Sequence, residues 1–244
     1  IDPSSPTIER CIVTQNRAEQ GTIACWYGAS PWLIECTMTR NVVTAEGGGV
    51  QGFAGSHPVI KRCRIEQNVA TNGASGGVSC LYNSCPTIEG CVIAGNAVLG
   101  EFWAGLGGFG GGIACLESSP FVKDCAIVGN YAILQGGGVK SRQSSSPRFV
   151  NCLIAGNRAG TWGGGYASEG EAGAVLAYST IAGNRAASLG GVGSQASNLR
   201  ISNSIIWGNT PNSAAGTMDH CVTVDDPLFV DQGEYDLDRF AVIQ

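Results

Sequence analysis

The chain has 244 residues, which is enough for one large domain or two small ones. Its formal net charge of −5 comes without a basic or an acidic run, which argues against nucleic acid and anionic membrane surfaces as partners. No apolar stretch of the sequence is long enough to span a bilayer.

A phrase of eleven residues recurs along the chain. PTIERCIVTQN (6–16) returns as PVIKRCRIEQN (58–68), PTIEGCVIAGN (86–96), PFVKDCAIVGN (120–130) and PRFVNCLIAGN (147–157). The asparagine that ends the phrase recurs at Asn16, Asn41, Asn68, Asn96, Asn130, Asn157, Asn184 and Asn209. Self-similarity at a period of about 27 residues indicates a solenoid.

Each repeat contains three short predicted strands. The phrase alternates with period two, as in Cys91, Val92, Ile93 and Ala94. A second strand follows each glycine cluster, and a third begins after each proline. Glycine is dense, with 37 residues, and β-branched residues mark the strand positions, so we predict an all-β parallel β-helix of about eight coils. We expect the coils over residues 1–210, and residues 211–244 as a closing segment of the same domain.

Stacked coils place equivalent residues in columns, because parallel strands lie about 4.8 Å apart. The cysteine of the phrase forms an inward column of small hydrophobic residues, and we predict free thiols there, because Ser179 and Ser204 replace it in the last two coils. The pattern leaves open a bridge between Cys80 and Cys85. The asparagine lies at a turn, where stacked amides hydrogen-bond along the column. Cys25, Cys80 and Cys115 form a second, partial column.

The phrase P-x-I-x-x-C-x-I-x-x-N, followed by GGG-[VI], resembles the repeats of right-handed parallel β-helix proteins of the pectate-lyase-like superfamily. The resemblance runs from Pro6 to about Asn209 and implies a right-handed parallel β-helix. The segment Ser204–Asp238 is similar to the closing segment of many secreted bacterial β-helix proteins, which implies an extracellular bacterial protein. The chain opens within the pattern, without a starting Met or a signal peptide, so we expect an excised module of a longer exported protein.

No catalytic set stands out in the predicted coils. A Ca²⁺-dependent polysaccharide lyase needs clustered carboxylates, but Asp124 is the only aspartate within the coils proper. His57 and His220 lack the Gly-His-Gly setting of polygalacturonases and do not serve a cysteine nucleophile. Glu117 and Glu169 remain as an alternative glycosidase pair. We therefore predict no catalytic residue, no metal site and no cofactor.

One set of aromatic residues borders a strip of small, uncharged residues beside the asparagine turn. The longest repeat contains the insertion Ala97–Phe109, and its neighbours supply further rings. Ring faces stack on the C–H faces of sugars, and aromatic grooves with a few polar groups are typical ligand sites. We therefore predict carbohydrate binding by Phe102, Trp103, Phe109, Tyr131, Trp162 and Trp207. A loop that folds down over the strip as a local core is the open alternative.

A second aromatic set follows the glycine strands on three adjacent coils and consists of Trp26, Tyr27, Phe53 and Tyr82. A ladder of rings across coils can track an extended glycan, because the rise per coil is comparable to one sugar unit. A lateral hydrophobic stack that seals loops is the alternative. Trp32 and Phe121 share another column, and we expect them to pack against their neighbours.

The fold alone does not select a function, because it hosts lyases, hydrolases, epimerases, adhesins and binding modules. Some β-helix domains attached to plant-polysaccharide enzymes are similar to carbohydrate-binding modules, including xylan binders. Together with the aromatic sets, this predicts a non-catalytic module that binds plant cell-wall polysaccharide, xylan-like first, beside a catalytic domain in the same parent chain. The alternatives are a polysaccharide lyase or glycoside hydrolase, and a surface adhesin or structural spacer.

Overall fold

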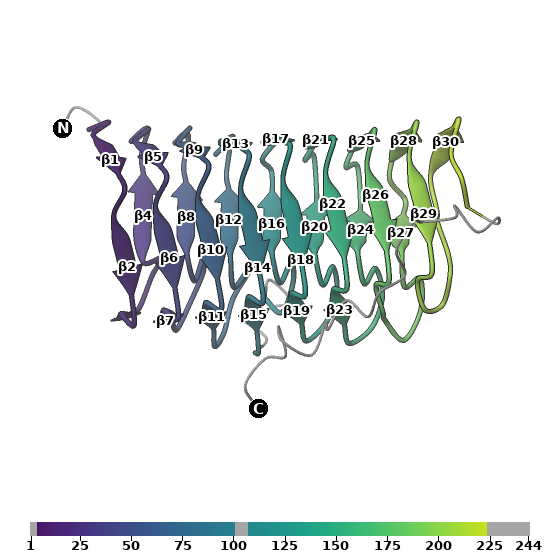
Figure 1. Cartoon of the computed structure of the whole chain (residues 1–244), viewed down its shortest axis with the longest axis horizontal. Helices are drawn as coiled ribbons and strands as arrows, with labels where there is room; N and C mark the ends of the chain where they lie inside the picture. The colour runs from purple at the N-terminus through teal and green to yellow at the C-terminus, as the bar shows by residue number, and fades with distance from the viewer. Residues whose placement is uncertain (1–3, 101–106, 224–244) are drawn as a thin grey trace.

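The computed structural model of the chain describes residues 4–100 and 107–223. These residues form a parallel β-solenoid of about seven complete coils, followed by part of an eighth and the first strand of a ninth, and the coils are stacked along one axis (Figure 1). The predicted all-β parallel solenoid is therefore confirmed. The coils are numbered here by the strand with which each begins, so that coil 1 begins at β1 (Thr7–Glu9). Among the described residues there is no helix long and apolar enough to cross a membrane.

Two of the four sheets contain the strands of the recurring phrase, and neighbouring strands pair in parallel. The first sheet runs along the top of Figure 1 and consists of β1, β5 (Trp32–Ile34), β9 (Val59–Lys61), β13 (Thr87–Glu89), β17 (Phe121–Lys123), β21 (Arg148–Val150), β25 (Val175–Ala177), β28 (Arg200–Ser202) and β30 (Thr217–Asp219). The second sheet consists of β2 (Ile12–Thr14), β6 (Thr37–Thr39), β10 (Arg64–Glu66), β14 (Val92–Ala94), β18 (Ala126–Val128), β22 (Leu153–Ala155), β26 (Thr180–Ala182) and β29 (Ile205–Trp207). Pairing of β28 with β30 carries the stacking past residue 210.

The other two sheets complete each coil. The third sheet lies along the bottom of Figure 1 and is made of two-residue strands, β3 (Arg17–Ala18), β7 (Val42–Val43), β11 (Val69–Ala70), β15 (Ala97–Val98), β19 (Tyr131–Ala132) and β23 (Arg158–Ala159). The fourth sheet lies behind the second and consists of β4 (Ile23–Trp26), β8 (Val50–Phe53), β12 (Val78–Leu81), β16 (Ile113–Leu116), β20 (Val139–Arg142), β24 (Tyr166–Glu169) and β27 (Val192–Gln195). Three strands per coil were expected, so the third sheet is an addition that the sequence pattern did not reveal.

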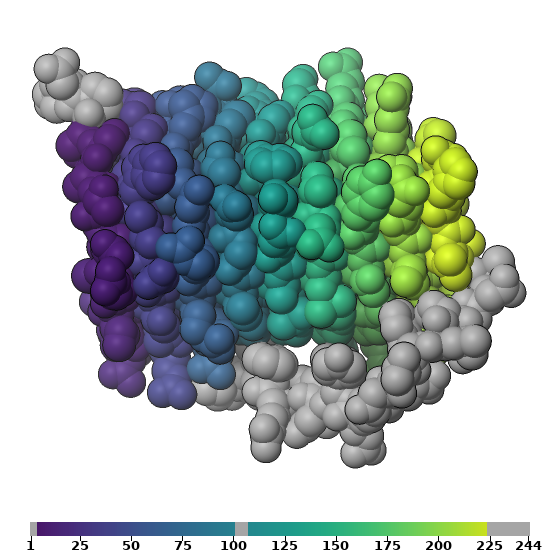
Figure 2. Space-filling model, turned by 45° about the horizontal axis from the view of Figure 1, so that its top comes forward, coloured from purple at the N-terminus to yellow at the C-terminus, as the bar shows by residue number. Residues whose placement is uncertain are grey.

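The core is a narrow channel filled by the inward side chains of the first, second and fourth sheets. Its residues are mainly Ile, Val, Leu and Cys, and they are almost completely buried. The predicted isoleucine column is in register, because Ile65 pairs with Ile93 and Ile93 with Ile127. The largest rings in this channel, Phe149 and Tyr166, pack edge to face at 5.7 Å. Figure 2 shows the coils as parallel bands across the outside of the molecule.

The predicted asparagine column forms a continuous hydrogen-bond ladder. The Asn96 backbone N–H and side-chain Nδ2 both donate to Asn130 Oδ1 at 3.0 Å. The Asn130 groups donate in the same way to Asn157 Oδ1, while its Nδ2 also donates to the Ile93 carbonyl at 2.9 Å. Each internal amide is thus saturated inside the protein, which fixes the turn that it occupies.

The glycine clusters provide the room that this ladder requires. A Cβ added at Gly138 would lie 2.5 Å from the Gly165 carbonyl oxygen and 2.9 Å from Asn157 Nδ2. Glycine therefore stands immediately before most of the fourth-sheet strands, because the backbone there passes directly against the amides of the ladder. The glycine before most of the ladder asparagines has a different cause, since Gly95 and its equivalents adopt a φ near +60°.

The cysteine column is both a packing column and a hydrogen-bonding column. Cys91 Sγ contacts the carbonyls of Glu89 and Ile60 at 3.3 and 3.4 Å, and it accepts the Cys63 N–H at 3.4 Å. In coil 7, Ser179 Oγ takes the same role, donating to the Ala177 carbonyl at 2.9 Å. This polar role, beyond that of a small hydrophobic residue, explains why serine substitutes for cysteine. All eleven cysteines are free thiols, including Cys80 and Cys85.

Removal of one internal rung of the asparagine ladder is predicted to destabilise the solenoid strongly. Asn130→Ala deletes the side-chain hydrogen bonds of this residue and leaves their buried partners in both neighbouring coils unsatisfied. We therefore expect a loss of about 3–4 kcal/mol in the free energy of unfolding. Asn16→Ala, at the exposed end of the ladder, is the matched control and should cost less than about 1 kcal/mol. Urea unfolding measures both, and equal losses would contradict the role of the ladder.

The buried thiols make stability depend on pH. Burial raises the pKa of the Cys152 thiol from 9.0 to about 12. Because the folded-state value lies above the unfolded one, this contribution is complete below pH 9 and is lost as the pH rises toward 12. Between pH 7.5 and 10.5, the wild type should lose about 2 kcal/mol more than Cys152→Ser, whose hydroxyl makes similar bonds without ionising. Urea unfolding at the two pH values tests this, and parallel losses in both proteins would contradict it.

Candidate functional site

The outer face of the fourth sheet carries two columns of outward side chains. Strand alternation places Gln51, Ser79, Ala114 and Lys140 in the first column. The second column contains Trp26, Phe53, Leu81, Leu116, Arg142 and Glu169. A third row lies above the first column, where the loop residues Ala74, Phe109, Gln135 and Trp162 form isolated bridges from coil to coil. These three rows define the fourth-sheet face.

Four aromatic residues form one contiguous cluster at the N-terminal end of this face. Trp26 lies 6.3 Å from Tyr27 and 6.1 Å from Phe53, measured between ring centroids. Phe53 is 5.3 Å from Tyr82 in an edge-to-face arrangement. Trp26, Tyr27 and Tyr82 keep 40%, 71% and 41% of their surface exposed. The cluster of Trp26, Tyr27, Phe53 and Tyr82, called here the aromatic platform, therefore presents rings to solvent while it packs laterally.

Gln51 fixes the position of the Trp26 ring. Its Oε1 accepts hydrogen bonds from Trp26 Nε1 at 3.0 Å and from the Gly21 N–H at 3.3 Å. Its Nε2 donates to Gln20 Oε1 at 3.1 Å and to Glu46 Oε2 at 3.4 Å. Both donors and both acceptor positions of this buried amide are used, so its orientation is fixed. The indole of Trp26 is consequently held in a single orientation.

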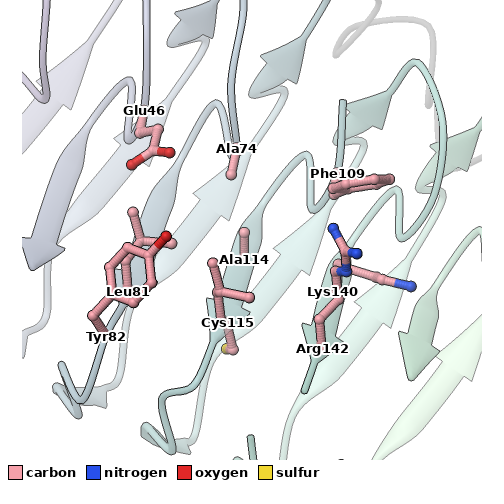
Figure 3. A pocket seen from close by; sticks show the side chains of 10 residues that line it. Glu46, Ala74, Leu81, Tyr82, Phe109, Ala114, Cys115, Lys140 and Arg142 are labelled. Atoms are coloured by element: carbon pink, nitrogen blue, oxygen red, sulfur yellow. The ribbon is translucent and has the colours of Figure 1, made fainter. Parts of the chain in front are cut away.

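A shallow, open trough lies beside the aromatic platform, with a cavity volume of about 30 Å³. Its floor contains Leu81, Ala114 and Leu116, and Figure 3 shows it bounded by Glu46 and Tyr82 on one side and by Phe109 and Arg142 on the other. The hollow exists because two small residues meet there. Ala74 precedes Phe109 in the loop row, and Ala114 precedes Lys140 in the first column. The residues that line the trough come from coils 2 to 5.

The far end of the trough is built around a buried lysine. Lys140 is only 1% exposed, and its ammonium donates to Gln135 Oε1 at 2.6 Å and to Glu169 Oε2 at 2.8 Å. The same ammonium lies 4.3 Å from the centre of the Trp162 ring. Burial lowers the pKa of Lys140 to about 8, although Glu169 opposes the shift. In Figure 3 the Lys140 ammonium points away from Ala114. Its hydrogen bonds therefore hold the neighbouring loop and strand in place, and the ammonium does not point into the trough.

Arg142 and Glu169 complete this end of the trough. The Arg142 guanidinium lies 4.9 Å from the Phe109 ring centre, and its Nε is 3.6 Å from Glu169 Oε2. Burial works against ionisation of Glu169, but the hydrogen bond from Lys140 and the two nearby cations outweigh it, so its pKa is lowered. Glu169 is therefore the counterion of Lys140 and Arg142.

Glu46 marks the opposite end of the trough. It lies in the loop between β7 and β8, and Figure 3 shows its carboxyl group directed toward Leu81 and Tyr82. Burial raises the pKa of this carboxyl, and the hydrogen bond from Gln51 offsets part of the effect. Among the described residues, no Lys, Arg or His forms an ion pair with it. A half-buried carboxyl group in a hollow without a counterion is suited to accept hydrogen bonds from a ligand.

The structure separates the predicted aromatic residues into several groups. The second set is brought together as the aromatic platform, and Phe109 joins it at the trough, although only 6% of its surface is exposed. Trp162 belongs to coil 6, two coils beyond Phe109, and its ring covers the ammonium of Lys140. Tyr131 lies in the third sheet and Trp207 in the second, apart from this face. Phe102 and Trp103 lie outside the described residues.

The small-residue strip on the second sheet is less exposed than its composition suggests. Ala94 and Gly95 are buried, and Val92 is half-buried, while Leu153 is exposed. A shallow depression beside Leu153 is lined by Asp124, Asn151 and Tyr178. The Asn151 amide donates to Asp124 Oδ1 at 2.6 Å, so these two polar groups of the depression satisfy one another.

The alternative glycosidase pair does not have suitable geometry. Glu117 and Glu169 belong to coils 4 and 6, so they are roughly 10 Å apart along the axis and also stand in different columns. Paired glycosidase carboxyl groups are about 5–9.5 Å apart. Glu169 is also held ionised by Lys140 and Arg142, which leaves it unsuited to act as the acid. No group of three His, Cys, Asp or Glu side chains that would hold a metal ion occurs in the described part of the chain.

Sequence reasoning missed Glu46, Gln51 and Lys140. Gln51 and Lys140 end the strand motifs GGGVQ and GGGVK, at a position occupied by Ser79 and Ala114 in the coils between them. A large polar residue in a column of small residues was the available signal. Glu46 gave no signal, because the loop row changes residue type from coil to coil.

Comparison with known proteins identifies the family of the repeat. The family described as the right handed beta helix region matches residues 1–134 and, in an overlapping match, residues 105–234. The two matches cover nearly the whole chain, including the aromatic platform and the trough. No curated protein matches the sequence.

The ion pair at the far end of the trough provides a test of the buried charge. Glu169→Gln leaves the Lys140 ammonium without its counterion, so we expect a loss of about 2–3 kcal/mol in stability at pH 7. The loss should shrink above pH 8, because the buried amine then gives up its proton. Urea unfolding from pH 7 to 9.5 measures both effects. Glu117→Gln, an exposed carboxylate on the same side, is the control, and a pH-independent loss would contradict the assignment.

Proposed function

The chain belongs to the right-handed β-helix family. Because a function depends on a particular site rather than on the fold that carries it, we propose from its surface that the chain binds an extended polysaccharide along its fourth-sheet face. The observation that carries the proposal is the exposed aromatic platform, which continues directly into a trough that contains hydrogen-bonding groups. Xylan-like chains of the plant cell wall are the first ligands to test.

The geometry of the face suits a chain that runs parallel to the solenoid axis. The platform and the trough together extend over coils 1 to 5, and each coil advances about 4.8 Å. Successive sugars would thus meet the side chains of successive coils. Trp26, Tyr27 and Tyr82 offer ring faces and edges for the apolar side of the sugars, while Glu46 and Arg142 offer polar contacts for hydroxyl groups.

The side chains available for chemistry favour binding over cleavage. Lys140 is the residue whose lowered pKa would suit a lyase base, but its ammonium is buried and used by Gln135 and Glu169. The carboxylates on this face are too far apart for a glycosidase pair. We therefore propose a non-catalytic module, secreted and attached to a polysaccharide-degrading domain of the same parent chain.

The test compares two tryptophans of similar exposure. Trp26→Ala removes the first ring of the platform, whereas Trp32→Ala removes a ring that is 46% exposed on the first sheet, outside the proposed site. In affinity electrophoresis on soluble xylan, mixed-linkage glucan, mannan and polygalacturonate, we expect retardation of the wild type by at least one glycan. Trp26→Ala should weaken it at least about tenfold, as expected for a central aromatic contact, and Trp32→Ala should not.

The outcomes separate the functional classes. A reducing-sugar assay and an absorbance assay for unsaturated products, run on the same samples, detect hydrolysis or elimination. Products from the wild type would overturn the non-catalytic proposal. A folded wild type that no glycan retards would favour the adhesin or spacer alternative, and equal losses in the two tryptophan variants would place the site elsewhere.

A further inference from the structure

The trough is chemically asymmetric along the solenoid axis. Glu46 belongs to coil 2 and Arg142 to coil 5, three coils or roughly 14 Å apart. At the Arg142 end, cations and a carboxylate are combined, because Lys140 and Arg142 share Glu169. At the Glu46 end, the carboxyl group accepts a hydrogen bond from the neutral amide of Gln51, and no cation of the described residues forms an ion pair with it. The platform end of the trough is therefore anionic or acceptor-rich.

Glu46 is held as part of the platform rather than as an independent loop residue. Gln51 directs its oxygen toward Trp26 and its Nε2 toward Glu46 and Gln20. The reverse orientation of the amide would place its donors against Trp26 Nε1 and the Gly21 N–H, so it is not allowed. The carboxyl group of Glu46 must therefore act as the acceptor toward Gln51. Figure 3 shows this carboxyl group directed toward Leu81 and Tyr82, which line the trough.

A carboxylate in this position discriminates between two classes of sugar. Hydroxyl groups donate charge-assisted hydrogen bonds to it, which are about twice as strong as neutral ones. A uronate carboxylate at the same subsite would instead place two like charges together in a partly desolvated hollow, which disfavours ionisation of both. The apolar floor of Leu81 and Leu116 contributes no donor to relieve that repulsion.

We propose that Glu46 is the specificity-determining residue of this face, accepting hydrogen bonds from the hydroxyl groups of a neutral sugar and excluding uronate sugars from the subsite beside the aromatic platform. This inference rests on the proposed glycan binding and defines its ligand class as a neutral polysaccharide. Gln51 is the positioning residue that joins the carboxyl group and the Trp26 ring into one unit.

The experiment uses a pair of charge-matched variants in affinity electrophoresis. Glu46→Gln and Glu117→Gln each remove one negative charge, so their mobilities in gels without glycan match, and Glu117 is an exposed residue outside the trough. The probes are soluble arabinoxylan and mixed-linkage glucan as neutral glycans and polygalacturonate as the uronate. Thermal unfolding of each variant verifies folding.

The wild type and Glu117→Gln should be retarded by a neutral glycan and pass polygalacturonate gels freely. Glu46→Gln should lose about tenfold in affinity for the neutral glycan, because neutral hydrogen bonds replace charge-assisted ones. It should also narrow the preference for neutral over uronate glycan by at least about tenfold, since the repulsion is removed.

Two results would overturn this inference while leaving glycan binding intact. One is a wild type that binds polygalacturonate as well as the neutral glycans, with Trp26→Ala abolishing both. The other is a Glu46→Gln protein that binds the neutral glycan as tightly as Glu117→Gln does. A folded wild type that binds none of the probes would instead overturn the proposed function itself, and this inference with it.

Discussion

The asparagine ladder is the interaction on which the rest of the structure depends. A parallel solenoid must turn its chain several times per coil, and each turn leaves backbone groups without a strand partner. At the corner after the second sheet, the side chain of Asn96 or Asn130 supplies those partners to the coil before and receives them from the coil after. The amides thereby fix the spacing, the register and the approach of the glycine backbone at once, and the isoleucine core stacks because that register is fixed.

Placement of the fourth-sheet face follows from that register. Because coils repeat in step, Trp26 stands above Phe53 and Phe53 above Leu81, so residues far apart in sequence form a continuous outer surface. The loop residues, which differ from coil to coil, then determine where this surface is raised and where it is hollow. Small residues at Ala74 and Ala114 open the trough, and Phe109, Trp162 and Lys140 close its far end. The core residues thus repeat from coil to coil, while the residues on the outer surface differ.

Much of the architecture could be predicted from the sequence because its signals are periodic. Alternation within the phrase identified the inward Cys91 and Ile93, and the recurrence of Asn identified the coils. The third sheet could not be predicted, since a strand such as Arg17–Ala18 is too short to show alternation. The aromatic platform was found because its columns follow the repeat. Glu46 was not found, because the burial of a charge depends on what the neighbouring coils place above it, and that differs at each coil. Lys140 was missed although its large polar side chain follows Ser79 and Ala114 in one column.

The serine and cysteine column has a consequence for how such a chain changes over time. Ser179 Oγ and Cys91 Sγ each accept a backbone N–H from the preceding coil and donate to the carbonyl two residues earlier in their own coil, so a coil of one kind can follow a coil of the other without loss of contact. Neighbouring coils are thus joined at this column by the same hydrogen bond, whether the residue is cysteine or serine. A whole coil is then a unit that duplication or deletion can add or remove, and the length of the outer surface can change in steps of one coil while the interior remains continuous.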